Sequence, residues 1–262
     1  MSHPRISVFA GSAKGIVDPI RVITGQASLL ARTMHTLSLD SVHDEIVVPN
    51  PFAEALLFFR AAGSGEEKPI RIIQGPKTML TYTDNAAVDP VHNEVFTSQR
   101  RTDSVMVFSR EANGDVAPIR VIHGPKTKLD RPVQVSVDPV NNILAVTTME
   151  GLWIFNRTDN GDVAPRAIIS GPKTGISGGN SELKVMVYPE GKKIFVSGGG
   201  PLKIWNYDDN GDVPPWGILT SSSKTEMHGS VSRVAINRAA KELIVLNRTS
   251  GVFIFSMPDL IQ

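Results

Sequence analysis

Apolar residues along this chain fall into short runs bounded by Gly, Asn, Asp and Pro. The runs are rich in Val, Ile and Phe, hold roughly four to six residues and recur about every 8–12 residues, which predicts antiparallel strands joined by turns. Helical periodicity is almost absent. The one helix-like stretch, PFAEALL at 51–57, matches a loop and a strand in the other repeats, and we assign it to those.

The strand pattern repeats with a period of about 50 residues, which predicts a repeat architecture. NGDVAPIRVIHGPKT at 113–127 returns almost unchanged at 160–174, and weaker copies begin at positions 14, 64 and 210. Two further phrases follow each copy. The first occupies 35–48, 84–97, 133–146, 183–196 and 232–245, and the second occupies 56–60, 105–109, 152–156, 202–206 and 252–256.

Each repeat contains four strands, which we call A, B, C and D. A single four-stranded antiparallel unit cannot cover both of its apolar faces, whereas units stacked around an axis can. The sequence therefore predicts an all-β fold: a five-bladed β-propeller of four-stranded antiparallel blades, in a single domain over residues 1–262. The predicted repeat units are about 6–55, 56–104, 105–151, 152–201 and 202–251, with a closing strand at 252–256.

A sixth copy of strand C, ISVFA at 6–10, leaves two ways to complete the last blade. In the first, VFIFS at 252–256 is strand C and the segment 19–23 supplies strand D, so that strands from both termini close the ring and remove its exposed edges. Residues 5–10 then form an extra edge strand or pair with another molecule. We favour this arrangement because 252–256 follows strand B through a short loop. In the second, 6–10 and 19–23 supply both outer strands and the C-terminal tail is displaced.

The connections between strands predict how charge is distributed. In this topology the D–A and B–C loops share one face, the top, and the A–B and C–D turns share the other. Asn-Gly in the C–D connection favours a tight hairpin, because both residues accept positive φ. Basic residues prevail in the D–A loops and acidic residues in the turns, so we expect a basic mouth that attracts anions. Accumulation of Asp in turns would give the same pattern without a function.

Composition argues against several classes of protein. A net charge of +1 is unlike that of a dedicated nucleic-acid-binding protein. The chain has no cysteine for a disulfide, a thiolate metal site or a thiol nucleophile. No apolar stretch approaches the roughly 18 residues of a membrane span, and the N-terminus lacks the pattern of a signal peptide. We therefore expect either a cytoplasmic protein or an exported one whose signal has been removed.

Units of the form NGDVAPIRVIHGPKT, followed by a strand that ends in VDP, resemble the repeats of the NHL-type β-propeller family. The resemblance covers about residues 5–256. It implies a propeller fold. It implies no single function, because proteins of that family include scaffolds, ligand binders and a few lyases and lactonases.

Departures from the repeat locate the candidate site, because duplication does not explain them. At one position of strand A the blades carry His35, Asp84, Val133, Leu183 and Ser232. One residue further in they carry Thr36, Asn85, Gln134, Lys184 and Arg233. Only the ends of inner strands and their loops converge in a propeller, so we predict that this second set binds a ligand at the top mouth.

A His–His–Asp group is the candidate for chemistry. His228 lies just before the last strand A and, with His35 and Asp84, comes from consecutive blades. Such a group can ligate a divalent metal or transfer a proton. The alternative is that these residues are present only because the mouth is polar and solvated, and have neither role. The sequence requires no cofactor and leaves its identity open, and a divalent metal is one option.

Cationic residues offer an anion site at the same mouth. Lys184 and Arg233 occupy neighbouring blades and favour a carboxylate, phosphate or sulfate, unless Glu182 pairs with Lys184. A further set of lysines recurs at equivalent positions, and inheritance through duplication explains it as well as an anion site does. This set is Lys77, Lys126 and Lys173 in GPKT, with Lys224 in SSKT.

No complete catalytic constellation is apparent: there is no serine-nucleophile elbow or zinc-protease pair, and TDNGD at 158–162 lacks the length and closing Glu of a calcium loop. We therefore predict a binding module for a small anionic ligand or a protein partner, with no nucleic-acid or membrane partner. Self-association through residues 6–10 is a further option. The alternative is a propeller lyase or hydrolase, metal-dependent or not, that uses the His/Asp group at the same mouth.

Overall fold

The computed structural model describes the chain except for residues 1–3, 33, 35, 84, 177–181, 199, 221–229, 248–249 and 261–262. The described residues form β-strands and short 3-10 turns, and no α-helix occurs among them. Within the same residues, no helix has the length and apolar character needed to cross a membrane. The all-β prediction is confirmed.

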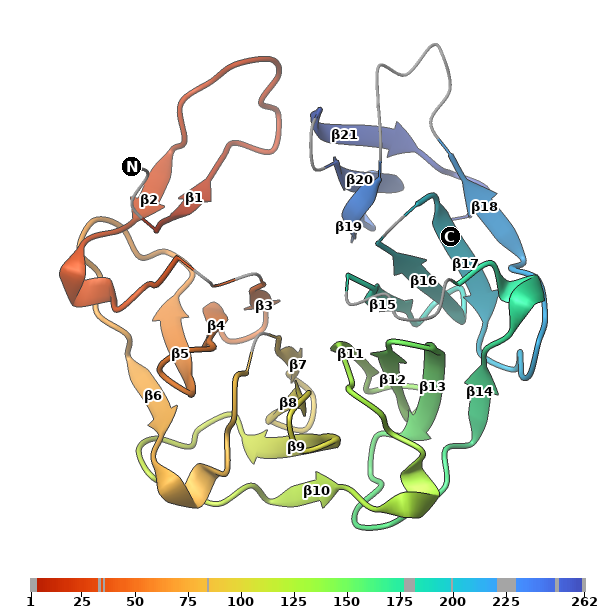
Figure 1. Ribbon diagram of the computed structural model, residues 1–262. Helices are drawn as coiled ribbons and strands as arrows, with labels where there is room; N and C mark the ends of the chain where they lie inside the picture. The colour runs from red at the N-terminus through yellow and green to blue at the C-terminus, as the bar shows by residue number, and fades with distance from the viewer. Residues whose placement is uncertain are drawn as a thin grey trace. The chain divides into compact units, whose positions relative to one another are not determined.

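Five antiparallel sheets follow one another along the chain and correspond to the predicted blades (Figure 1). The first two are β3 (Ser38–Asp40), β4 (Glu45–Asn50), β5 (Ala55–Arg60), β6 (Arg71–Gln74) and β7 (Ala87–Asp89), β8 (Glu94–Gln99), β9 (Ser104–Ser109), β10 (Arg120–Ile122). The next two are β11 (Gln134–Asp138), β12 (Ile143–Thr148), β13 (Gly151–Asn156), β14 (Ala167–Ile169) and β15 (Lys184–Tyr188), β16 (Lys193–Ser197), β17 (Leu202–Asn206), β18 (Gly217–Leu219). The last is β19 (Val231–Asn237), β20 (Glu242–Asn247), β21 (Gly251–Ser256). The fold is a five-bladed β-propeller of the four-stranded antiparallel type, with three strands described in the last sheet.

The terminal strands resolve part of the closure question. In the last sheet β21 pairs with β20, so VFIFS is strand C, as the favoured arrangement expects. The extra strand expected at 5–10 is β1 (Ile6–Val8), which pairs with β2 (Arg21–Ile23) in a separate sheet. Supply of strand D by the N-terminus therefore stays a prediction. A single domain also stays a prediction, since the chain packs as two compact units, residues 1–97 with 107–119 and residues 98–106 with 120–262.

Alternating side chains along each strand form the core between neighbouring sheets. In the second unit, Val196 faces the third sheet, where it joins a cluster with Val185 and Ile154. Phe195, the preceding residue of β16, faces the fifth sheet and packs with Leu243. This alternation follows from the two-residue period of a strand. It fixes which side chains of β15 and β16 can meet β19.

A set of hydrogen bonds, which we call the clasp, joins the NGD segment of one blade to the preceding blade. Asn113 Oδ1 accepts a hydrogen bond from Ile72 N at 3.0 Å, and Asp115 Oδ1 accepts one from Lys77 N at 2.7 Å. At the first blade Glu66 replaces the Asp. The equivalent pairs in the second unit are Asn160 with Val121, Asp162 with Lys126, Asn210 with Ile168 and Asp212 with Lys173.

Each clasp ends on a 3-10 turn formed by the GPKT phrase or its equivalent. These turns are η1 (Gln26–Ser28), η2 (Pro76–Thr78), η3 (Pro125–Thr127) and η4 (Pro172–Thr174). In η2, Thr78 Oγ1 donates a hydrogen bond to Gly75 O at 2.6 Å. Gly75 has a φ of 132°, and a Cβ there would lie 2.6 Å from Asp115 Oδ1. The turn therefore requires the Gly and a hydroxyl side chain, which is Ser28 in η1 and Thr in the other three turns, and this explains why the phrase recurs.

The clasp corrects two expectations. Asn-Gly does not close a tight hairpin, because β9 ends at Ser109 and β10 begins only at Arg120, and the connection between them runs back to the preceding blade. The carboxylates of Asp115 and Asp162 consequently lie beside D–A loops. The predicted separation of charge into a basic top and an acidic bottom is therefore wrong for these groups.

A buried ionic network stabilises the A–B turn of the first blade. Arg71 donates two hydrogen bonds to Glu45, at 2.9 and 2.6 Å, and Arg110 donates another at 3.0 Å. Arg110 also lies 3.8 Å from Asp40, whose other oxygen caps the turn by accepting from Val42 N. Burial alone would raise the pKa of Glu45, but the bonds and charges of the two arginines outweigh it and hold that pKa below its usual value.

Candidate functional site

The predicted His–His–Asp group lies outside the described residues, because His35, Asp84 and His228 all fall in the gaps. Its role in metal binding or proton transfer therefore stays a prediction. Among the described residues, no three His, Cys, Asp or Glu side chains come together as metal ligands. His43 and His92 lie in A–B turns, and each pairs through Nδ1 with a buried Asp at 2.8 Å.

The predicted ligand-binding residues Thr36 and Asn85 belong to the first unit. Thr36 is partly buried and lies just before β3. Asn85 is 1% exposed, and its carbonyl oxygen accepts a hydrogen bond from Thr97 Oγ1 at 2.7 Å. The burial of Asn85 limits what its side chain can offer to a ligand.

Gln134 joins two neighbouring blades. It begins β11, is 4% exposed, and its Oε1 accepts a hydrogen bond from Val185 N in β15 at 3.1 Å. Two residues along, Ser136 Oγ accepts one from Val187 N at the same distance. These bonds connect the inner strands of adjacent blades, a role that the sequence alone does not distinguish from ligand binding.

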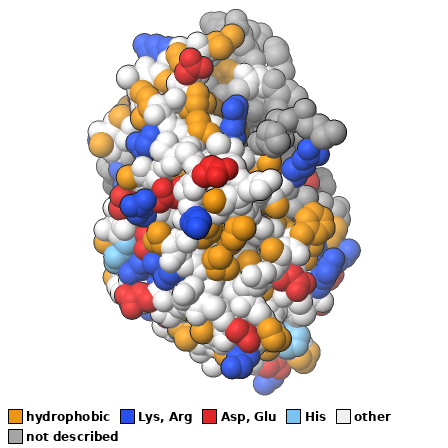
Figure 2. All heavy atoms as spheres, turned by 90° about the vertical axis from the view of Figure 1, so that its left-hand side faces the viewer, with side chains coloured by type: hydrophobic (Ala, Val, Ile, Leu, Met, Phe, Trp, Pro, Cys, Tyr) orange, Lys and Arg blue, Asp and Glu red, His pale blue; other side chains and the backbone are white. Residues whose placement is uncertain are grey.

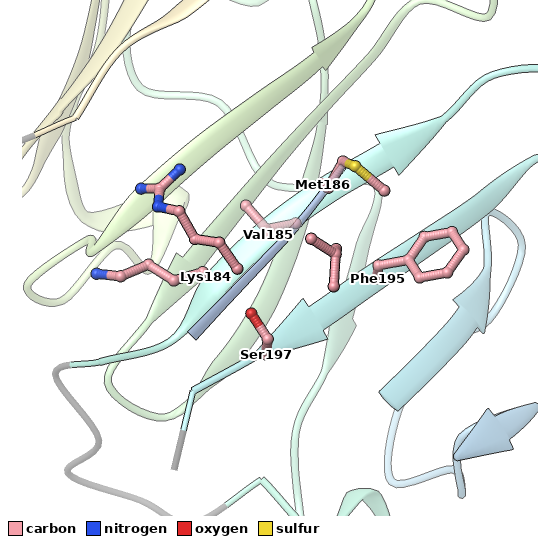
Figure 3. A pocket seen from close by; sticks show the side chains of 7 residues that line it. Lys184, Val185, Met186, Phe195 and Ser197 are labelled. Atoms are coloured by element: carbon pink, nitrogen blue, oxygen red, sulfur yellow. The ribbon is translucent and has the colours of Figure 1, made fainter. Parts of the chain in front are cut away.

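Lys184 and Arg233 line one cleft, as their positions on neighbouring blades predict. Both side chains are partly buried. The cleft lies between β15 and β16 on one side and β19 on the other, all within the second unit. Its lining residues are Lys184, Val185, Met186, Phe195, Ser197, Arg233 and Val234 (Figure 3).

The strand register positions the polar end of this cleft. Lys184 pairs with Ser197 across β15 and β16, and paired residues share one face of a sheet. On the opposite wall, the register between β19 and β20 shifts between Val231 and Arg233, which marks a β-bulge at Ser232. Ser197 Oγ donates a hydrogen bond to Ser232 O at 3.2 Å. Bulges commonly re-aim side chains beside functional sites, and Arg233, which follows this one, lines the same cleft as Lys184 and Ser197.

The lysines of the GPKT turns are placed differently. Lys77, Lys126 and Lys173 have exposed side chains, and their main-chain amides donate the clasp bonds. Lys224 lies outside the described residues. On the face drawn in Figure 2, Lys and Arg side chains are interspersed with Asp and Glu. The turn explains the position of these lysines without an anion.

Sequence reasoning missed the apolar part of the cleft. Met186 and Phe195 are directly paired across β15 and β16, two residues along from Lys184 and Ser197. The predicted antiparallel pairing of strands A and B would have placed them on the same face as Lys184. Ser197 belongs to the phrase SGGG, which predicts only a loop.

No protein-family model matches the chain, and no curated protein matches it in sequence. Solved structures do match in fold. One is Kuenenia stuttgartiensis hydrazine synthase, with a TM-score of 0.59 and 14% identity over 89% of this chain and 59% of that one. Another is the β-propeller domain of Myceliophteria thermophila Cps50 (Swd1), with a TM-score of 0.59 and 11% identity over 87% of this chain and 67% of that domain. The chain thus spans little more than half of the hydrazine synthase chain, and what these likenesses establish is a β-propeller fold.

Proposed function

We propose that this protein is a binding module that holds a small anion in the cleft between β15 and β19. The observation that carries the proposal is the convergence of Lys184 and Arg233, from two neighbouring blades, on one partly buried cleft. Both are departures from the repeat, since the same position carries Thr36, Asn85 and Gln134 elsewhere. Membership of the NHL-type family is compatible with this role.

The chemistry of the two side chains suits an anion. The guanidinium of Arg233 can bind both oxygens of a carboxylate with parallel hydrogen bonds, and the ammonium of Lys184 adds a compact charge. Partial burial strengthens both interactions, because the effective dielectric constant is lower there than in water. An anion between the two cations would be attracted by both.

Binding fits this cleft better than catalysis. Among the described residues that line it, none is a His, Asp, Glu or Cys that could act as a general acid or base. Ser197 donates its hydroxyl hydrogen to a main-chain oxygen rather than to a base. The alternative lyase or hydrolase depends on His35, Asp84 and His228, so stoichiometric metal that disappears on changing His35 or Asp84 would favour that alternative.

A thermal-shift experiment tests the proposal. The protein is titrated with acetate, butyrate, phosphate and sulfate, and its melting temperature should rise with at least one of them. Lys184→Met combined with Arg233→Met should abolish that rise. The matched control is Lys126→Met with Lys173→Met, which removes the same charge from exposed positions and should leave the rise unchanged. If no anion raises the melting temperature, or if the first double variant gains as much as the parent, the proposal is wrong.

A further inference from the structure

We propose that the anion is a monocarboxylate with a short apolar chain. This inference rests on the proposed function and goes beyond it by naming the ligand class. Its basis is that the cleft has a polar end and an apolar end. Among the described residues that line it, Met186, Phe195 and Val234 are apolar and belong to the core between the fourth and fifth sheets or pack on it.

The register of the fourth blade separates the two ends. Lys184 pairs with Ser197, and Met186 pairs with Phe195 two residues further along the same strands. All four side chains lie on one face of the sheet, since residues i and i+2 share a face. Figure 3 shows Lys184 and Ser197 on one side and Met186 and Phe195 on the other.

The distance between the ends sets the length of the ligand. A strand rises about 3.3 Å per residue, so the charged row and the apolar row are about 7 Å apart. A carboxylate bound at Lys184 and Arg233 would therefore direct its chain toward Met186 and Phe195. A chain of a few carbon atoms spans that separation.

The size of the cleft limits the ligand that it can hold. Its empty volume is about 190 Å³, including the part that is open to solvent. An anion as large as a nucleotide or an oligosaccharide would therefore extend out of the cleft.

Hydrogen-bonding capacity favours a carboxylate over phosphate or sulfate. The hydroxyl hydrogen of Ser197 is directed to Ser232 O, so that side chain offers a ligand an acceptor rather than a donor. The two cations can satisfy the two oxygens of one carboxylate. Further oxygens of a tetrahedral anion would lie against Met186, Phe195 and Val234, where they would lose water without gaining hydrogen bonds.

Isothermal titration calorimetry with a homologous series tests the inference. Each buried methylene strengthens binding by about 0.8 kcal/mol, which is roughly a fourfold fall in Kd. From acetate through propionate to butyrate, Kd should fall about fourfold per step, and phosphate should bind more weakly than butyrate. The fall should end once the chain fills the apolar end.

Two single variants locate the effect. Met186→Gln keeps the shape of the side chain but makes it polar, and it should remove the dependence on chain length while acetate still binds. Met257→Gln is the control, because Met257 is also partly buried and packs on the same core cluster without lining the cleft. This control variant should leave the dependence of Kd on chain length unchanged.

The outcomes separate this inference from the proposed function. Binding that depends on Lys184 and Arg233 but does not strengthen with chain length, or that is tighter for phosphate than for butyrate, overturns the inference alone. A Met257→Gln variant that alters the series as much as Met186→Gln also overturns it. Absence of any anion binding overturns the proposed function as well.

Discussion

The clasps and the cleft both join neighbouring blades, but the sequence encodes them in opposite ways. Each clasp uses residues that recur, such as Asp115 and Asp162, and directs their side chains to main-chain amides of the preceding blade. The cleft uses Lys184 and Arg233, which occur where other blades carry uncharged side chains. In this chain the recurring residues of the clasps connect neighbouring blades, whereas we propose that the exceptions Lys184 and Arg233 bind a ligand.

The comparison predicts two kinds of variant. Changes in the clasps, or in the Arg110–Glu45 network of the first blade, should lower stability and leave anion binding intact. Changes in the cleft should weaken anion binding and leave stability intact.

The largest expected effect is that of Arg110→Met. Arg110 is 7% exposed, contacts Glu45, Asp40 and Asn93, and its loss leaves buried carboxylates with fewer partners. We expect the free energy of unfolding to fall by about 3–5 kcal/mol, measured by denaturant titration. Arg131→Met, which removes an arginine paired with Asp130 at the surface, is the control and should cost no more than about 1 kcal/mol. Equal effects of the two variants would show that the network is not stabilising.

A smaller loss is expected from Gly124→Ala in a clasp of the second unit. Gly124 has a φ of 129°, and a Cβ would lie 2.6 Å from Asp162 Oδ1. Strain of this kind costs of order 1–3 kcal/mol. The control is Gly200→Ala, where a Cβ meets nothing within 4 Å and φ is not positive. A neutral Gly124→Ala variant would contradict the account of why GPKT recurs.

The pH dependence of stability provides a further test. The pKa of Glu45 is lower in the folded protein than its ordinary value of 4.5. Its contribution to stability is therefore complete above that value and is lost as the pH falls through the folded pKa. Glu45→Gln should lower stability at pH 7 and reduce the slope of stability against pH below 4.5. An unchanged slope in acid denaturation curves would show that another group controls it.

The smallest effect concerns Glu182, the candidate counter-ion of Lys184. Glu182 is exposed, and an exposed ion pair contributes about 0–1 kcal/mol. If it competes with the anion, Glu182→Gln should tighten butyrate binding by up to about fivefold in calorimetry. Weaker binding in this variant would assign Glu182 a supporting role instead.

The sequence predicts the blades well because their signals are local. Alternating runs such as VQVSV and ILAVTT define strands, and a period of about 50 residues orders them. The same order places Lys184 and Arg233 on neighbouring blades, and the structure brings them to one cleft.

What the sequence could not predict depends on contacts between blades. Asn-Gly at 113–114 has the composition of a tight hairpin, but the parallel bridge between Ile73 and Gly114 shows that it joins another blade. The structural role of Gln134 could not be predicted for the same reason, because its hydrogen bond to Val185 N requires the next blade to be in place. The bulge at Ser232 arises from the register of β19 on β20, for which the sequence gives no local signal.

The most direct test of an anion-binding cleft is a methyl NMR titration of methionine-labelled protein with butyrate. The chain has eight methionines, of which Met186 lines the cleft and Met257 does not. The account predicts a saturable shift of the Met186 methyl signal and a Met257 signal that stays in place. A Met186 signal that does not move, or shifts of equal size at both methionines, would contradict it.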